Sequence, residues 1–183
     1  MTIGKDEIKA LLEKLDDSLE TPQTICLIGS IALILMGHAE RNTQDIDVWA
    51  QASDFDEIAM RHAAENAGLL YNPLDEIPEL PYIQIVHPGI VQVPGYDAVS
   101  GNWFDQPPHV LWKGRHLTVQ CPPPEVIVAS KLRRFSDRDV TDSIWLISHS
   151  KLAAEAIMEA VKLLPETYRE DAEDNLAMLK AIM

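Results

Sequence analysis

Residues 25–50 read ICLIGSIALILMGHAERNTQDIDVWA, and this stretch decides the fold. Its first apolar run, 25–28, predicts a short strand. Gly29 and Ser30 lead directly into a second apolar run, which predicts a helix. After a polar loop, residues 45–50 alternate acidic and apolar side chains, which is the period of a strand. The stretch therefore predicts a strand, a helix and a second strand in close succession.

Two features of this stretch indicate chemistry. A strand that ends in Gly29-Ser30 and continues as a helix leaves backbone N–H groups that attract an anion such as a triphosphate. Glycine lets the backbone approach that anion closely. Asp45 and Asp47 lie two residues apart on a strand, so their carboxylates face the same side. Mg²⁺ prefers carboxylate and phosphate oxygens, so the pair predicts a site for one or two Mg²⁺ (or Mn²⁺) ions.

The Asp-x-Asp spacing alone does not identify such a site, because it occurs three times in the chain. Asp54 and Asp56 precede a predicted helix, where capping accounts for them. Asp137 and Asp139 also flank a predicted helix start. Only the first pair lies on an apolar strand downstream of a Gly-Ser turn. Its sequence context therefore distinguishes it from the other two pairs.

The rest of the chain predicts an α/β protein. Further strands are expected at 82–86, 90–93, 109–112 and 116–120, and helices at 5–20, 53–68, 125–135, 138–149, 151–163 and 166–181. This pattern indicates a mixed β-sheet flanked by helices over residues 1–121 and a C-terminal helical bundle over 122–183. The three prolines 122–124 mark the expected junction.

The formal charge is −14, from 15 basic and 29 acidic residues. Such a charge disfavours non-specific binding to nucleic acid. Lys131, Arg133, Arg134 and Arg138 are nevertheless clustered, and form either a local basic wall or a solvated helix face. The charged N-terminus and the absence of a sufficiently long apolar run predict a cytoplasmic protein with no membrane contact.

The Gly-Ser, helix and Asp-x-Asp pattern resembles the motif of the nucleotidyltransferase superfamily. Residues 29–50 are similar to the minimal bacterial nucleotidyltransferases related to abortive-infection and type IV toxin–antitoxin systems. Residues 130–146, SKLRRFSDRDVTDSIWL, resemble the helical segment that follows the core in those proteins. The resemblance implies a nucleotidyltransferase-like core that binds an NTP. It also implies sites for the triphosphate at Gly29 and Ser30, for the metal at Asp45 and Asp47, for a phosphate at Lys131, and for the nucleotide or second substrate at Arg41.

The same resemblance raises a question about the third acid. The related enzymes supply a third carboxylate from a later strand, where this chain has Gln84 and Gln92. Asp97 is the nearest substitute, either as a catalytic acid or as an ordinary turn residue. In the later segment, Arg138, Asp139 and Asp142 form either a second shell to the site or a salt-bridge network that docks helices.

Three functions follow from these alternatives. The first is transfer of a nucleoside monophosphate from an NTP to a hydroxyl on an RNA end, a protein or a small molecule. The second is a binding or regulatory module that keeps the fold but has lost turnover, and a toxin–antitoxin-type system is one setting for it. The third is a pure interaction protein, for example an antitoxin-like partner whose acidic surface masks a basic protein. Separately, the apolar C-terminal helices could form the face of a homodimer. All three acceptors fit the sequence.

Overall fold

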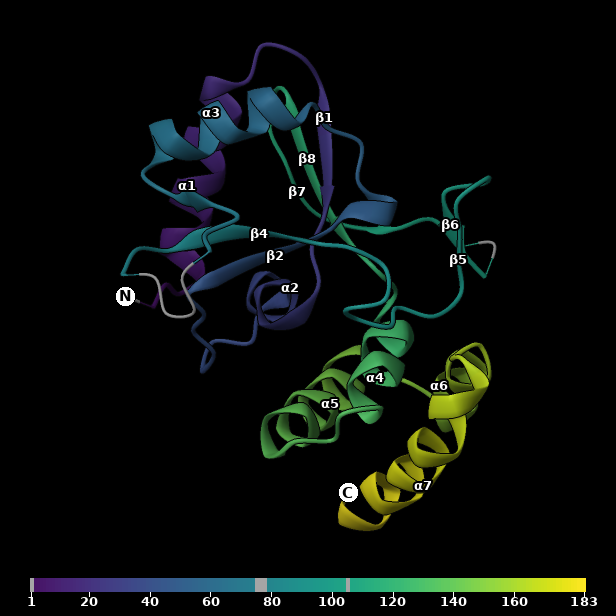
Figure 1. Ribbon diagram of the computed structural model, residues 1–183. Coiled ribbons are helices and arrows are strands. Elements are labelled where there is room, and N and C mark those ends of the chain that lie inside the picture. The colour runs from purple at the N-terminus through teal and green to yellow at the C-terminus, as the bar shows by residue number, and fades with distance from the viewer. Residues whose placement is uncertain (1, 75–78, 105) are drawn as a thin grey trace. The chain divides into compact units, whose positions relative to one another are not determined.

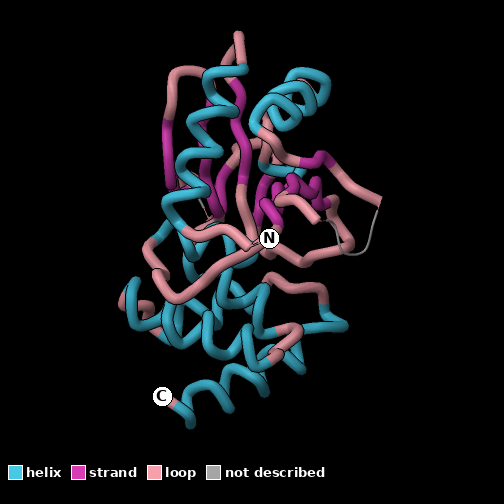
Figure 2. Tube along the Cα trace, turned by 90° about the vertical axis from the view of Figure 1, so that its left-hand side faces the viewer, coloured by secondary structure: helices cyan, strands magenta, loops and turns pink. Residues whose placement is uncertain are grey.

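A computed structural model describes residues 2–74, 79–104 and 106–183 (Figure 1). The chain divides into two compact units. The sheet unit consists of residues up to 87 together with 109–121, and the helical unit consists of 88–108 together with 122–183. Figure 2 shows the long strands in the sheet unit and mostly helices in the helical unit. Each unit is described by itself below.

The sheet unit contains a mixed β-sheet built from two sets of strands. In the first set, β8 (Leu117–Cys121) lies between β1 (Gln23–Cys26) and β7 (His109–Lys113), parallel to β1 and antiparallel to β7. In the second, β4 (Tyr82–Val86) lies between and parallel to β2 (Asp45–Trp49) and β3 (Leu70–Tyr71). An antiparallel bridge between Leu27 and Val48 connects the two sets. The acid-bearing strand β2 therefore lies at the centre of this sheet.

Helices cover the sheet unit and close its core. The helices are α1 (Lys5–Ser18), α2 (Gly29–Met36) and α3 (Glu57–Ala67), with a short 3-10 turn at Ala50–Ala52. Helix α1 packs against α3, and α2 packs against β2 (Figure 1). The five residues 31–35 of α2 are all buried. A helix that is apolar on every side is stable only inside a core, so packing holds α2 where it follows β1.

The helical unit packs four helices around its own core. These are α4 (Pro124–Leu132), α5 (Asp137–Ser150), α6 (Ala154–Lys162) and α7 (Glu166–Ile182). Helix α4 contacts the other three, and the buried side chains of this unit include Leu132 of α4, Leu146 of α5 and Leu176 of α7. A small antiparallel hairpin, β5 (Tyr96–Asp97) and β6 (Asn102–Trp103), also belongs to this unit. The mixed α/β architecture with a C-terminal helical region is the predicted fold class.

Two predicted elements differ from those observed. No strand forms over 90–93; Pro88 and Val91 make only an isolated bridge, and the segment groups with the helical unit. The helix predicted from residue 53 begins at Glu57, because Asp54 exchanges two backbone hydrogen bonds with Thr24 and extends the sheet. Asp56 then caps the helix by accepting a hydrogen bond from the Ala59 N–H at 2.8 Å.

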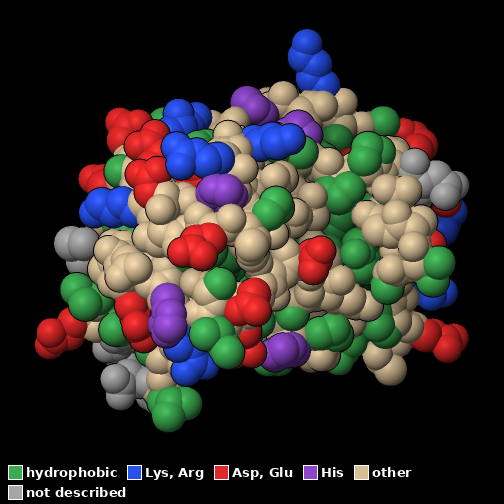
Figure 3. Space-filling model, turned by 90° about the horizontal axis from the view of Figure 1, so that it is seen from above, with side chains coloured by type: hydrophobic (Ala, Val, Ile, Leu, Met, Phe, Trp, Pro, Cys, Tyr) green, Lys and Arg blue, Asp and Glu red, His purple; other side chains and the backbone are tan. Residues whose placement is uncertain are grey.

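Charged groups are interspersed on the face of the molecule shown in Figure 3. Acidic, basic and histidine side chains alternate there, and the acidic excess does not form one continuous expanse. The net charge of −14 is counted over the whole chain, and this face alone does not carry a uniformly acidic surface. Within the described residues, no helix combines the length and apolar character needed to cross a membrane.

Candidate functional site

The acid pair lies on β2, as the alternation of residues 45–50 predicts. Asp45 and Asp47 are half-buried, whereas Ile46 and Val48 between and after them are fully buried. Burial of the apolar residues fixes which way the strand faces, so both carboxylates emerge on the other side. Thr43 precedes the strand, and its hydroxyl donates a hydrogen bond to the Asp45 carboxylate.

Asp47 lies directly against the start of α2. The Ile28 N–H donates to the backbone carbonyl of Asp47 at 3.0 Å, which ties the end of β1 to β2. A Cβ atom added to Gly29 would lie 2.9 Å from Asp47 Oδ2. Gly29 also has a φ of +70°, which favours glycine. Both observations explain why a glycine stands here: the carboxylate occupies the space that any side chain would need.

The start of α2 is suited to bind an anion. Ile28, the N-cap residue of this helix, makes no side-chain cap, and Gly29 and Ser30 are both partly exposed. The first N–H groups of a helix lack partners within the helix, and the helix dipole adds a partial positive charge to them. The structure thus brings these two predicted phosphate-binding residues and the carboxylate of Asp47 into one place.

The neighbouring strand β4 adds two side chains to the same face. In the parallel register, Tyr82 pairs with Asp45 and Gln84 pairs with Asp47. Paired residues on adjacent strands point to the same face of a sheet. Burial raises the pKa of the Tyr82 phenol, and the charges of Asp45 and Asp47 raise it further. Sequence reasoning missed Tyr82, because only the pairing of β2 with β4 places it beside the acids.

The donor set fits a hard divalent cation. Asp45 and Asp47 present carboxylate oxygens on one face of a rigid strand, which is the ligand chemistry that Mg²⁺ and Mn²⁺ select. Over residues 2–74, 79–104 and 106–183, no group of three or more His, Cys, Asp or Glu side chains is placed to hold a metal. The position next to Asp47 on β4 is instead occupied by the amide of Gln84.

Asp97 belongs to the helical unit and stabilises a turn there. Its carboxylate accepts hydrogen bonds from the Val99 N–H at 2.9 Å and from the Ser100 hydroxyl at 2.8 Å. These hydrogen bonds lower the pKa of Asp97 below its usual value. The side chain is exposed and follows Gly95 in the β5–β6 hairpin. The observed contacts are those of a turn residue; its role as a third acid stays a prediction.

Lys131 is buried in the helical unit and its charge is paired there. Its Nζ lies 2.7 Å from Asp142 Oδ2 and 3.3 Å from Asp139 Oδ1. Arg134 also reaches Asp139 Oδ1, at 2.9 Å. Burial alone would raise the pKa of Asp139, but the hydrogen bond from Ser136 and the two cations bring it below its usual value. This network joins α4 to α5.

The other basic residues predicted near the site have different surroundings. Arg138 is exposed at the start of α5, and no ion pair of this residue is seen in the described part of the chain. The guanidinium of Arg133 lies 4.1 Å from the centre of the Tyr168 ring. Arg41 is half-buried in the segment between α2 and β2, where its backbone N–H donates to the backbone carbonyl of His38. Because Lys131 is buried, the predicted basic cluster is not one continuous surface.

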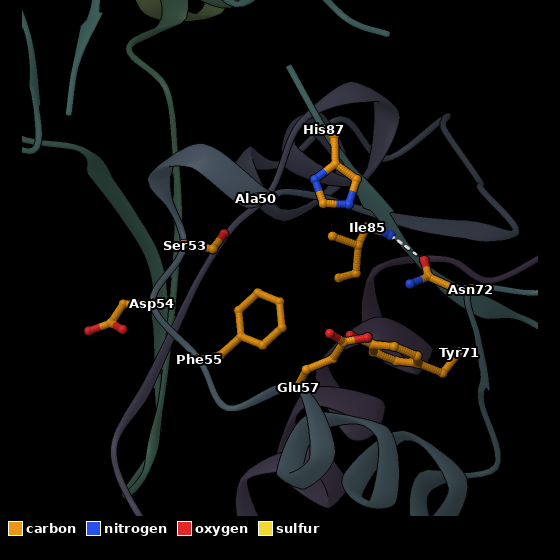
Figure 4. Close-up of a pocket in the computed structure, with 9 residues that line it drawn as sticks. All are labelled: Ala50, Ser53, Asp54, Phe55, Glu57, Tyr71, Asn72, Ile85 and His87. Carbon is orange, nitrogen blue, oxygen red and sulfur yellow. Dashed lines mark hydrogen bonds between the residues drawn. The ribbon is translucent and has the colours of Figure 1, made fainter. Parts of the chain in front are cut away.

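A cavity of about 280 Å³ lies on the reverse face of the sheet unit (Figure 4). It is lined by Ala50, Ser53, Asp54, Phe55, Glu57, Tyr71, Asn72, Ile85 and His87. Ile85 pairs with Val48, and Tyr71 pairs with Ile83. The side chains of Ile85 and Tyr71 therefore lie on the sheet face opposite the acid pair. Burial, followed by the charge of Glu57, raises the pKa of Tyr71 to about 12. No local sequence signal predicted this cavity.

A comparison with protein families gives a match over most of the chain. The family model described as "Nucleotidyltransferase of unknown function (DUF6036)" matches residues 6–179. No curated protein and no solved structure matches this chain. The match spans both units and includes the acid pair, the Gly29-Ser30 turn and the Lys131 network.

Proposed function

Because the chain belongs to this family of nucleotidyltransferases, we propose that it transfers a nucleoside monophosphate from an NTP to a hydroxyl acceptor with the help of Mg²⁺ or Mn²⁺. The observation that carries the proposal is the position of Asp47. Its carboxylate lies on the same strand face as Asp45 and packs against Gly29 at the start of α2. A metal-binding pair and an anion-binding helix start are therefore adjacent.

Each group has a defined task in this reaction. The N–H groups at Gly29 and Ser30 and the Ser30 hydroxyl bind the triphosphate, because helix starts stabilise phosphate charge. Asp45 and Asp47 hold the divalent cation, which when bound neutralises phosphate charge. The acceptor oxygen forms a bond to the α-phosphorus while the bond from that phosphorus to the bridging oxygen breaks. Pyrophosphate leaves, and the hydroxyl proton passes to solvent.

The proposal also covers the acceptor, the location and the partners. The acceptor is an RNA end, a protein or a small molecule, and the net charge of −14 makes a long RNA the least favourable of these. We place the protein in the cytoplasm, where NTPs are available. The relation to toxin–antitoxin and abortive-infection systems rests on the resemblance of residues 29–50 and 130–146. A homodimer or a protein partner is compatible with each acceptor.

A second candidate function is a binding or regulatory module that takes up the nucleotide without turnover. Gln84 favours it, since this amide stands next to Asp47 where a carboxylate would act as a base. An amide does not accept a proton near neutral pH. The two functions share the nucleotide site and differ only in whether pyrophosphate is released.

Thermal unfolding with each NTP, with and without Mg²⁺ or Mn²⁺, tests the shared site. A ligand at 100 times its Kd stabilises the folded state by about 2.7 kcal/mol. We expect a metal-dependent rise in Tm for the wild type and for Asp54→Asn, and none for Asp47→Asn. Asp54 is the matched control because it belongs to another Asp-x-Asp pair of the same unit and is exposed. The absence of any shift in the wild type would overturn the proposal. Pyrophosphate release then separates the two functions.

A further inference from the structure

The side chain of Gln84 has an orientation that the backbone determines. The Ile85 N–H donates to Asn72 Oδ1 at 2.7 Å. A backbone N–H can only donate, so the oxygen of the Asn72 amide must face it. The Gln84 amide also meets this oxygen, at 3.3 Å, and must therefore present its NH₂ group. Asn72 has a φ of +47°, a conformation that asparagine tolerates better than most residues.

In this orientation the NH₂ group of Gln84 bonds to Asn72, and the amide oxygen Oε1 does not. Gln84 pairs with Asp47, so its side chain leaves the sheet on the acid face, while its NH₂ group reaches Asn72 on the β3 side of β4. The alternative orientation would have turned an NH₂ group to that face. Such a group would donate to a carboxylate of this face and compete with a cation for it. The amide oxygen, in contrast, is a neutral ligand of the kind that hard cations accept.

The charge of this face limits how many cations it holds. Asp45 and Asp47 contribute two negative charges, and Gln84 and Tyr82 contribute none. Two divalent cations held close together repel one another, so each needs protein carboxylates as well as phosphate oxygens, and the next side chain on this face is the neutral amide of Gln84. A single divalent cation balances the two carboxylates. A bound triphosphate supplies its own oxygens to that same cation.

We infer that Gln84 makes this a one-metal site: Asp45 and Asp47 hold a single divalent cation with the nucleotide, and Gln84 stands as the neutral side chain where a second cation would need a carboxylate. The inference rests on the proposed nucleotide site and specifies its stoichiometry. Gln84→Glu adds a carboxylate of nearly the same shape at this position, and creates the ligand set for a second cation.

Metal counting by ultrafiltration tests this inference without any turnover. The 20.5 kDa protein is mixed with excess Mn²⁺ and an NTP analogue with a methylene bridge between the α- and β-phosphates, and the retained Mn²⁺ and nucleotide are measured. We expect one Mn²⁺ per retained nucleotide for the wild type and two for Gln84→Glu. Gln44→Glu is the matched control, because it adds the same charge beside β2 one residue before Asp45. It should retain one.

Each outcome has a distinct meaning. Two Mn²⁺ in the wild type would overturn the one-metal inference and leave the proposed function standing. One Mn²⁺ in both the wild type and Gln84→Glu would also overturn it, because Gln84 would then not occupy the position of a missing ligand. A wild type that retains neither metal nor nucleotide would refute the proposed function and the inference together. Thermal unfolding of Gln84→Glu without ligands shows that the variant is folded before its metal is counted.

Discussion

Substitution of Gly29 by alanine tests how closely the acid pair and the start of α2 are linked. A left-handed backbone costs an alanine about 1–2 kcal/mol, and Gly29 has a φ of +70°. The added Cβ would also lie 2.9 Å from Asp47 Oδ2, whereas ordinary contacts begin at 3.4 Å. Oδ2 must therefore move away by about 0.5 Å (3.4 − 2.9). We expect a loss of about 1–2 kcal/mol in stability, and about 10–100-fold weaker Mn²⁺ binding, the usual effect of displacing a metal ligand's support.

Gly68→Ala separates the two effects. Gly68 has a φ of +81°, belongs to the same unit, and a Cβ added there would meet nothing within 4 Å. This variant should lose a similar amount of stability while binding Mn²⁺ and the NTP analogue as the wild type does. Stability is measured by urea unfolding, and Mn²⁺ affinity by titration with saturating nucleotide analogue. If Gly29→Ala binds Mn²⁺ with wild-type affinity, the close approach of Gly29 does not position Asp47 and the reasoning is refuted.

Three further predictions concern stability, each measured by urea unfolding. The carboxylate of Asp16 accepts three backbone N–H bonds at 2.7–2.8 Å, so Asp16→Asn should lose about 1.5–3 kcal/mol at pH 7. Burial would raise the pKa of Asp16, but these donors outweigh it and lower the pKa below 3.8. The wild type should therefore lose this stability as the pH falls below 3.8, and Asp16→Asn should not; parallel pH profiles would contradict the assignment. Lys131→Met leaves two buried carboxylates without their ammonium and should cost about 3–5 kcal/mol, with partial recovery in Lys131→Met/Asp142→Asn. A cost below 1 kcal/mol, on the order of an exposed pair, would show that the network contributes little. The buried hydroxyl of Tyr71 has no hydrogen-bond partner among the described residues, so Tyr71→Phe should keep or raise stability; a loss of about 1 kcal/mol, the net worth of a hydrogen bond, would reveal a missed partner.

The strand, helix and strand of residues 25–50 could be predicted from the sequence because their signals are local. Apolar runs bounded by Gly29 and a polar loop define the first two elements, and the alternation of Asp45 and Asp47 with buried residues defines the third. The face that the two acids share follows from the strand period alone. Most boundaries differ by a few residues, since helix and strand ends depend on caps and pairing.

Long-range pairing, in contrast, left weak signals. Residues 90–93 have the composition of a strand, but composition does not say whether a partner strand is available. Among the residues that the structure describes, this segment pairs only through a single bridge. Segment 88–108 groups with the helical unit, although in the sequence it is preceded and followed by segments of the sheet unit. The sequence left Lys131 as either a phosphate-binding residue or a helix-surface lysine, and only the packing of α4 on α5 buries it beside Asp139 and Asp142.

The sequence by itself determined that this chain has a Gly-Ser helix start and two acids on one face of a following strand, because both are properties of consecutive residues. Only the tertiary structure decided that Asp47 packs against Gly29 and that Gln84 and Tyr82 flank the acids. The register between β2 and β4 is set by which apolar residues of the two strands are buried together. That choice depends on the whole core, so no local pattern in residues 45–49 or 82–86 contains it.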